Sequence, residues 1–332
     1  MKKFILLTIS AIFLTSCEKE IEFNGEQTDP RLVINSIVDV GQPVKAHVSK
    51  SLFFLDNEGT TSAPADTQVE LWVNDAPKET MHTADTTYIN GRPIVWFESH
   101  YCPIVADIIN ITSSVNVFED VEGTTSTLPS SVEFRLADKT VKEIDSYYIS
   151  YDDEDSALYV YGQMDIIVEI TDPNPGKTDL FRLWIQMNEY DIDTVDQYYA
   201  SNYYVSHEFT DPVFGAAIAT NDYVDISDLD TRPEGVFSDA LFDGGSYQIK
   251  VPLYFNLTRR DNTDPDFFEV PVMIEHLSKE YYYYLNTCEQ GSEIASFFAE
   301  PTQVYSNVTN GFGIVGGRWI DSTWMALPIV EP

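Results

Sequence analysis

The sequence has little of what most enzymes, metalloproteins and nucleic-acid-binding proteins require. Its 332 residues include 3 cysteines and 5 histidines, and 19 Lys and Arg stand against 54 Asp and Glu. No HExxH, CxxC or GxSxG motif is present, and no glycine-rich phosphate loop follows a predicted strand. The sequence therefore predicts no enzyme, although catalytic groups assembled from distant residues stay open as an alternative. No histidine pairs at a metal-ligand spacing among His47, His82, His100, His207 and His276.

The acidic composition limits the class of partner. The formal net charge is −35 at pH 7, which leaves no basic patch to neutralise phosphates and excludes nucleic acid as a partner. Surface solubility explains such a charge, and attraction of divalent cations or basic partners is the alternative. A hydrophobic content of 43% and an aromatic content of 13% exclude a disordered chain.

A short apolar run at the start of the chain ends at a cysteine. Phe4 to Leu14 follows two lysines, and at about 1.5 Å per residue it is too short to cross about 30 Å of hydrocarbon. It predicts a secretory signal peptide. Leu14-Thr15-Ser16-Cys17 resembles a bacterial lipobox, which implies cleavage before Cys17 and its acylation with palmitate-type chains. The alternative is an ordinary signal peptide with a chance cysteine.

The residues after Cys17 bear on localisation. The segment Glu18 to Glu22 (EKEIE) resembles the acidic stretch that follows the lipid cysteine of Bacteroidetes-type surface lipoproteins. This resemblance implies an outer-membrane protein, held in lipid through acylated Cys17 and facing the cell exterior. A solvated tether on the inner face of the outer membrane is the alternative.

The remaining length predicts two domains on a mainly β chain. We expect a signal peptide at residues 1–16, an acylated tether at 17–30, an immunoglobulin-like β-sandwich at 31–127 and a larger β-rich domain at 128–332. Short alternating strands with turns between them predict the sandwich. Asn90-Gly91, between two β-rich runs, is its strongest hairpin signal. The hydroxyl-rich stretch Gly123 to Pro129 marks the boundary.

One amphipathic helix is predicted in the second domain, near residues 278–290. Ser278 can cap its start and Gly291 can end it. Because two lone cysteines make no disulfide framework, we expect Cys102 and Cys288 to be buried free thiols. Apolar residues at helical spacing predict one buried face, formed by Leu277, Tyr281, Tyr284, Leu285 and Cys288.

Several stretches of the second domain carry a family resemblance. They are Phe237 to Gly244 (FSDALFDG), Glu280 to Leu285 (EYYYYL), and FAEP, SNV and GFGI between residues 298 and 314. With the CEKEI start and the LVINS strand, the mature chain resembles the lipoprotein family catalogued as domain of unknown function 4249. Such lipoproteins are commonly encoded beside TonB-dependent receptors. The resemblance implies an accessory binding component of a nutrient uptake system, and carries over no catalytic residue. A structural or adhesive surface lipoprotein and a surface hydrolase are the alternatives.

Acidic clusters and tyrosines are the candidate binding residues. Ca²⁺ takes six to eight oxygen ligands, and Asp191, Asp193 and Asp196 are the Ca²⁺ candidates, with solvated turns as the alternative. No other cofactor is predicted. Tyrosines between residues 147 and 161 lie near acids, which suits sugar or peptide binding, although Tyr is also a good strand former. Because binding residues favour loops on a rigid scaffold, the predicted surface is lined by Tyr148, Tyr151, Asp153, Asp155 and Tyr199.

Overall fold

The computed structural model describes residues 29–51, 64–89, 92–150, 156–186, 188–190, 202–215, 235–260, 268–288 and 304–330. Among these residues no helix is long and apolar enough to span a bilayer. The helical elements are η1 (Pro212–Gly215), η3 (Asp239–Leu241) and α2 (Lys279–Cys288). The strands are β1 (Leu32–Asp39), β2 (Lys45–Lys50), β3 (Gln68–Val73), β4 (Ala76–Thr80), β5 (His82–Ile89), β6 (Arg92–Glu98), β7 (Ile109–Ser114), β8 (Val121–Thr124), β9 (Glu133–Ser150), β10 (Ser156–Thr171), β11 (Leu180–Ile185), β12 (Asn188–Tyr190), β13 (Asn202–His207), β14 (Val236–Ser238), β15 (Ser246–Arg260), β16 (Glu269–Leu277), β17 (Val308–Thr309) and β18 (Phe312–Ala326).

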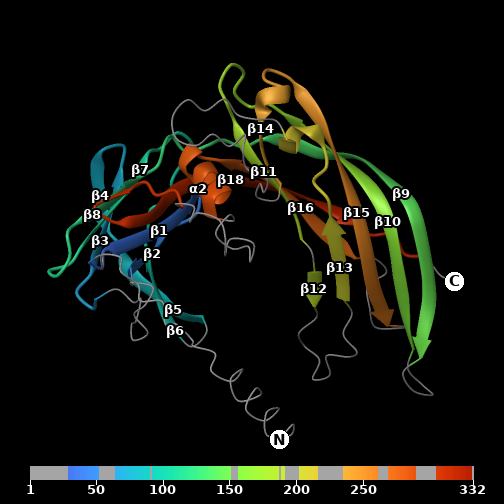
Figure 1. Cartoon of the computed structure of the whole chain (residues 1–332), viewed down its shortest axis with the longest axis horizontal. Helices are drawn as coiled ribbons and strands as arrows, with labels where there is room; N and C mark the ends of the chain where they lie inside the picture. Colours follow the sequence, from blue (N-terminus) through green and yellow to red (C-terminus); the bar gives the residue numbers. More distant parts are fainter. Residues whose placement is uncertain are drawn as a thin grey trace, which may run out of the picture.

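These strands form three sheets, which confirms the mainly β fold with its one α-helix in the described part of the chain (Figure 1). The shared sheet has eight strands in the order β14-β11-β16-β18-β1-β2-β6-β5. The N-terminal sheet has the order β17-β8-β7-β3-β4, and the platform sheet has the order β12-β13-β15-β10-β9.

The last strand joins the two halves of the chain. β18 pairs in parallel with β1 over residues 312–318 and antiparallel with β16 over residues 318–326. Because side chains alternate along a strand, Val315 and Met325 lie on the same face of the shared sheet. Val315 belongs to the core under the N-terminal sheet, and Met325 belongs to the core under the platform sheet. The two flanking sheets therefore pack side by side on one face of the shared sheet.

The N-terminal sandwich follows from alternating sequence. The strand β1 alternates buried and half-buried residues along its whole length, and β7 does the same, so each buries one face. β5 and β6 pair antiparallel up to Ile89 and Arg92, as the predicted hairpin requires, and its turn residues Asn90 and Gly91 lie outside the described part of the chain. The core of this sandwich also includes Leu128, Val308 and Val315. The shared sheet and this core thus continue past the boundary predicted after residue 127, and the division into two domains stays a prediction.

The helix α2 covers the other face of the shared sheet. The hydroxyl of Ser278 accepts a hydrogen bond from the backbone N–H of Tyr281 at 3.4 Å, which confirms the predicted cap. Gly316 of β18 permits close packing, because a Cβ at this position would lie 2.8 Å from the Cβ of Tyr281. The core around the helix is formed by Leu180, Val236, Leu277, Tyr281, Tyr282, Tyr283 and Leu285.

Two expectations about this region are wrong. Tyr282 and Tyr283 are buried although they lie outside the predicted apolar face, because Tyr283 packs its ring against Tyr305 at a centroid distance of 5.5 Å. Cys102 and Cys288 are free thiols as expected, but both are exposed. Cys288 is the last residue of α2 and Cys102 lies in an irregular segment after β6, so neither is covered by a sheet.

Candidate functional site

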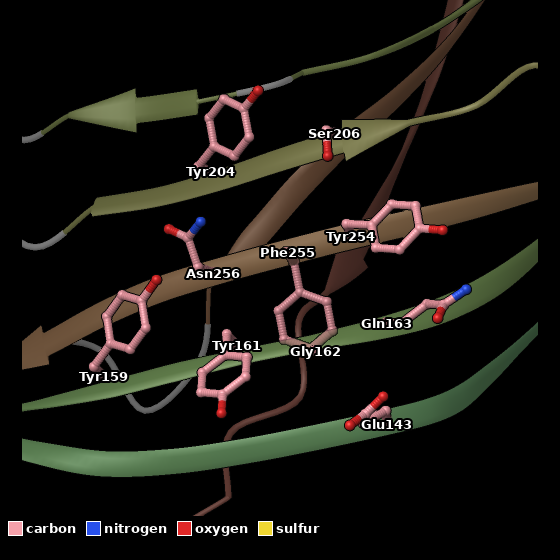
Figure 2. Close-up of a pocket in the computed structure, with 10 residues that line it drawn as sticks. All are labelled: Glu143, Tyr159, Tyr161, Gly162, Gln163, Tyr204, Ser206, Tyr254, Phe255 and Asn256. Carbon is pink, nitrogen blue, oxygen red and sulfur yellow. The ribbon is translucent and has the colours of Figure 1, made fainter.

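A hollow of about 360 Å³ lies on the outer face of the platform sheet (Figure 2). This face points away from the core, because the alternating residues of β10 and β15 on the other face are buried. The volume falls in the usual range of small-molecule sites, about 300–1,000 Å³. The hollow is lined by Glu143, Tyr159, Tyr161, Gly162, Gln163, Tyr204, Ser206, Tyr254, Phe255 and Asn256.

Strand register brings these residues together. Asn256 of β15 pairs with Tyr161 of β10 on one side and with Tyr204 of β13 on the other. One row along the sheet, Tyr254 lies in the same way between Gln163 and Ser206. Neighbouring strands are about 4.8 Å apart and alternate residues about 7 Å, so two polar and aromatic rows run side by side.

A glycine fixes the floor of the hollow. The ring of the buried Phe255 packs against Gly162, where a Cβ would lie 3.0 Å from the Phe255 Cζ atom and would clash with the carbonyl oxygen of Glu143. A side chain at this position would therefore push β9, β10 and β15 apart. The glycine keeps the three strands close beneath the two rows.

Tyrosines form the walls and continue toward the edge strand. The ring centroids of Tyr147 and Tyr159 are 5.2 Å apart, and those of Tyr159 and Tyr161 are 5.9 Å apart. The Tyr161 hydroxyl donates a hydrogen bond to Asp145 Oδ2 at 3.0 Å, and this bond and the Asp145 charge raise the pKa of Tyr161. Tyr161 stays a hydroxyl donor at neutral pH, held in place by the carboxylate. Four of the rings are 40–48% exposed, those of Tyr147, Tyr161, Tyr204 and Tyr254.

Polar groups of the hollow have unused hydrogen-bonding capacity. Within the described part of the chain, the side chains of Gln163, Asn256 and Ser206 make no hydrogen bond. Each free amide offers two N–H donors and one carbonyl acceptor. Glu143 adds a carboxylate that has no cation partner among the described residues. These groups are free to bind a ligand.

Three basic residues of the platform sheet, Arg135, Lys142 and Lys250, are paired with acids beyond the hollow. Lys142 and Lys250 both contact Asp165 Oδ2, at 3.2 and 2.7 Å. The bond from Lys250 lowers the pKa of Asp165, and Lys142 adds to this effect. Arg135 contacts Glu169 at 2.7 Å. Among the described residues that line the hollow, none is a cation.

A separate cluster of carboxylates lies between the turns at residues 172–179 and 239–245. One oxygen from each of Asp172, Asp239 and Asp243 lies within 4.8 Å of the others. Burial raises the pKa of Asp239 to about 6, and the charges of Asp179, Asp172 and Asp243 add to this. Carboxylate oxygens are the ligands that Ca²⁺ prefers. The backbone N–H groups of Gly176, Asp179 and Gly244 already bond to carboxylates of the cluster.

Of the five predicted binding residues, Tyr148 is the one that the structure describes. It lies on β9 and is 49% exposed, but alternation places it on the opposite face from Tyr147 and Tyr161. It pairs in register with buried Leu158 and does not line the hollow. The other predicted residues lie outside the described part of the chain, namely Tyr151, Asp153, Asp155 and Tyr199, the Ca²⁺ candidates Asp191, Asp193 and Asp196, and Cys17.

Sequence reasoning drew attention to the tyrosines near residues 147–161 but missed the residues opposite them. Gln163, Ser206, Tyr254 and Asn256 belong to no motif, and nothing in their local sequence distinguishes them. The one available signal is the alternation of β10, β13 and β15, which separates outward from inward positions without giving the register.

Fold and hollow together describe a β-sandwich protein with an exposed, tyrosine-lined hollow on its platform sheet. The family model described as Domain of unknown function (DUF4249) matches residues 18–322, and the chain belongs to this family. No curated protein matches the sequence. A presumed membrane-anchored protein from Corynebacterium diphtheriae, known from a crystal structure, matches with 9% identity and a TM-score of 0.19. The match covers 76% of this chain and 55% of that one, and a likeness at this level carries no argument about fold or function.

Proposed function

We propose that this protein is a lipid-anchored accessory binding protein of the outer membrane, facing the cell exterior, which serves a TonB-dependent uptake system. In this proposal Cys17 carries the acyl chains and residues 17–30 form the tether. The ligand binds in the hollow on the platform sheet. The leader, the acidic segment after Cys17 and the family's association with such receptors support the anchoring and the partner.

The observation that carries the binding role is the combination of exposed rings and free amides on a rigid sheet. Tyr204 and Tyr254 keep more than two fifths of their surface in water beside amides without partners. The strands beneath them are long, and their inner faces belong to the larger of the two sandwich cores. Such a surface is preformed, so a ligand does not have to order it.

The chemistry of the lining favours binding over turnover. The described residues that line the hollow include no histidine, cysteine or lysine and a single carboxylate, Glu143. General acid–base chemistry on a sugar or peptide generally needs two titratable groups or a nucleophile with its base. The hydrolase alternative is therefore less well supported by this site.

The anchor is tested by replacing Cys17 with alanine in the native host. We expect the variant to lack lipid and to leave the membrane fraction, because its thiol is the proposed acylation site. Cys102→Ala is the matched control, since Cys102 is an exposed free thiol away from the leader, and it should stay in the outer membrane. A Cys17→Ala protein that remains lipidated in the outer membrane overturns the proposed anchor.

The partner is tested by isolating the full-length lipoprotein in mild detergent after brief crosslinking. We expect a TonB-dependent receptor to co-isolate with it. If no such receptor is recovered from cells that express both proteins, the uptake role fails, and recovery of matrix or pilus proteins instead would favour the adhesive alternative.

A further inference from the structure

The rings of the hollow suit a ligand with flat apolar faces. Tyrosine has an apolar body and a polar tip, so an exposed ring can cover C–H groups while its hydroxyl stays hydrated. Tyr159 and Tyr161 lie on one side of Asn256, and Tyr204 lies on the other (Figure 2). A ligand that crosses the strands therefore meets aromatic surface on both sides of a central amide.

The polar groups suit a ligand whose groups both donate and accept. Gln163 and Asn256 each present N–H donors and a carbonyl acceptor, and Ser206 presents a hydroxyl. The carboxylate of Glu143 accepts hydrogen bonds and donates none. A hydroxyl group is the ligand counterpart that can use every member of this set, because it donates one hydrogen bond and accepts two.

The negative charge at the hollow argues against an anionic ligand. Glu143 lines the hollow without a cation partner in the described part of the chain, and Asp145 lies beside it as the acceptor for Tyr161. Phosphates, sulfates and uronic acids would meet these carboxylates and no compensating base. A basic peptide would suit the acids and the rings, and its backbone carbonyls accept hydrogen bonds from amides such as those of Gln163 and Asn256, so it is the competing ligand that the test must separate.

We infer that the hollow binds a neutral oligosaccharide, whose sugar faces pack on the tyrosines and whose hydroxyls bond to Glu143, Gln163 and Asn256. This inference rests on the proposed binding function and names its ligand class. The pair Tyr147 and Tyr159 adds a third row beside the two already described. Four strands about 4.8 Å apart and three rows about 7 Å apart give a platform roughly 14 Å in each direction, larger than one sugar ring. The ligand is thus a chain of sugars that lies across the strands.

The test uses the mature chain made soluble by Cys17→Ala and a panel of defined probes. The neutral probes are hexamers of α-glucan, β-glucan, mannan, xylan, galactan and N-acetylglucosamine. Oligogalacturonate is the anionic probe and heptalysine the basic peptide. Affinity is measured by calorimetry, and the fold of each variant is checked by circular dichroism and thermal unfolding.

We expect at least one neutral oligosaccharide to bind, and the double variant Tyr161→Ala/Tyr204→Ala to weaken it at least tenfold. Asn256→Ala should weaken it about fivefold or more. Tyr148→Ala is the matched control, because Tyr148 is as exposed as these tyrosines but lies on the opposite face of the platform sheet. The affinity of this variant for the oligosaccharide should stay within twofold of that of the unmutated chain. Tyr204→Phe should keep most of the affinity, since it retains the ring.

Three outcomes overturn the inference: tighter binding of oligogalacturonate or heptalysine than of every neutral probe, no binding of any neutral probe, or full affinity in the folded double variant. Receptor co-isolation is measured on the same variants in their lipidated form. Failed sugar binding with intact co-isolation overturns the ligand class alone, whereas failed co-isolation of the wild type overturns the uptake role whatever the sugar result.

Discussion

Replacing Arg318 by methionine tests what holds the shared sheet together at the junction of the two sandwiches. Arg318 lies on β18 where the strand passes from β1 to β16. Its Nε donates to Asp39 Oδ1 of β1 at 2.6 Å, and its Nη1 donates to Glu275 Oε1 of β16 at 2.6 Å. Burial lowers the pKa of Arg318. The bond to Asp39 and the charges of Glu275 and Asp39 raise it by more than burial lowers it, so the pKa lies above its ordinary value.

The expected loss comes mainly from Glu275. This residue is 5% exposed, and its Oε2 atom has no hydrogen-bond partner in the described structure, so the guanidinium is its compensating charge. Removing one partner of a buried ion pair costs about 3–5 kcal/mol. The Asp39 side chain is 36% exposed, so its pair contributes less than about 1 kcal/mol. Methionine keeps most of the apolar stem. We expect Arg318→Met to lower the free energy of unfolding by about 3–4 kcal/mol.

The assay is urea unfolding at pH 7, followed by tryptophan fluorescence and far-ultraviolet circular dichroism. Arg135→Met is the control, because its pair with Glu169 has the arginine side chain 62% exposed, and it should lose less than about 1 kcal/mol. Adding Glu275→Gln to Arg318→Met removes the uncompensated charge and should restore at least half of the loss. A loss for Arg318→Met as small as that of the control, or a double variant no more stable than the single one, would refute this reasoning.

Two further predictions concern the acidic cluster and the helix. The pKa of Asp239 is about 6 in the folded protein, against an ordinary value of 3.8. Ionisation of this carboxyl therefore opposes folding. The free energy of unfolding should fall by up to about 3 kcal/mol as the pH rises from below 3.8 to above 6 without divalent cations. Asp239→Asn should remove this fall and be the more stable protein at pH 7 in thermal unfolding from pH 4 to 7, and identical profiles would contradict the assignment. Gly316→Ala should cost about 1–3 kcal/mol because its Cβ meets Tyr281, whereas Gly215→Ala, with no atom within 4 Å of its Cβ, should change stability by less than about 0.5 kcal/mol. Equal effects in urea unfolding would show that α2 is not held closely against β18.

Local features were predictable because local residues determine them. The pairing of β5 with β6 could be predicted because Asn-Gly between two β-rich runs favours a two-residue hairpin turn. The start of α2 depends on the Ser278 hydroxyl and the backbone N–H three residues later. Neither depends on distant parts of the chain, so the sequence alone was sufficient for both.

Long-range pairing was not predictable in this way. β1 and β18 pair in parallel although Asp39 and Arg318 are 279 positions apart, and no local pattern in either strand names the other. The same limit applies to the hollow. In the pair Tyr147-Tyr148 one ring must face outward, but which ring joins the hollow's face depends on how β9 pairs with β10. The prediction therefore named a tyrosine-rich segment that borders the hollow but chose Tyr148, which lies on the other face of β9.

The arrangement of the sheets also separates the proposed anchor from the proposed binding site. The proposed tether of residues 17–30 could extend at most about 50 Å and would join the body at β1, near the middle of the shared sheet. The hollow lies on the outer face of the platform sheet, and Figure 1 shows the strands β9, β10 and β15 of this sheet at the opposite side of the molecule from β1. A net charge of −35 also repels anionic head groups from the body. Because the proposed anchor precedes β1 and the proposed ligand site lies on the platform sheet, the affinity of the soluble Cys17→Ala protein should equal that of the anchored protein.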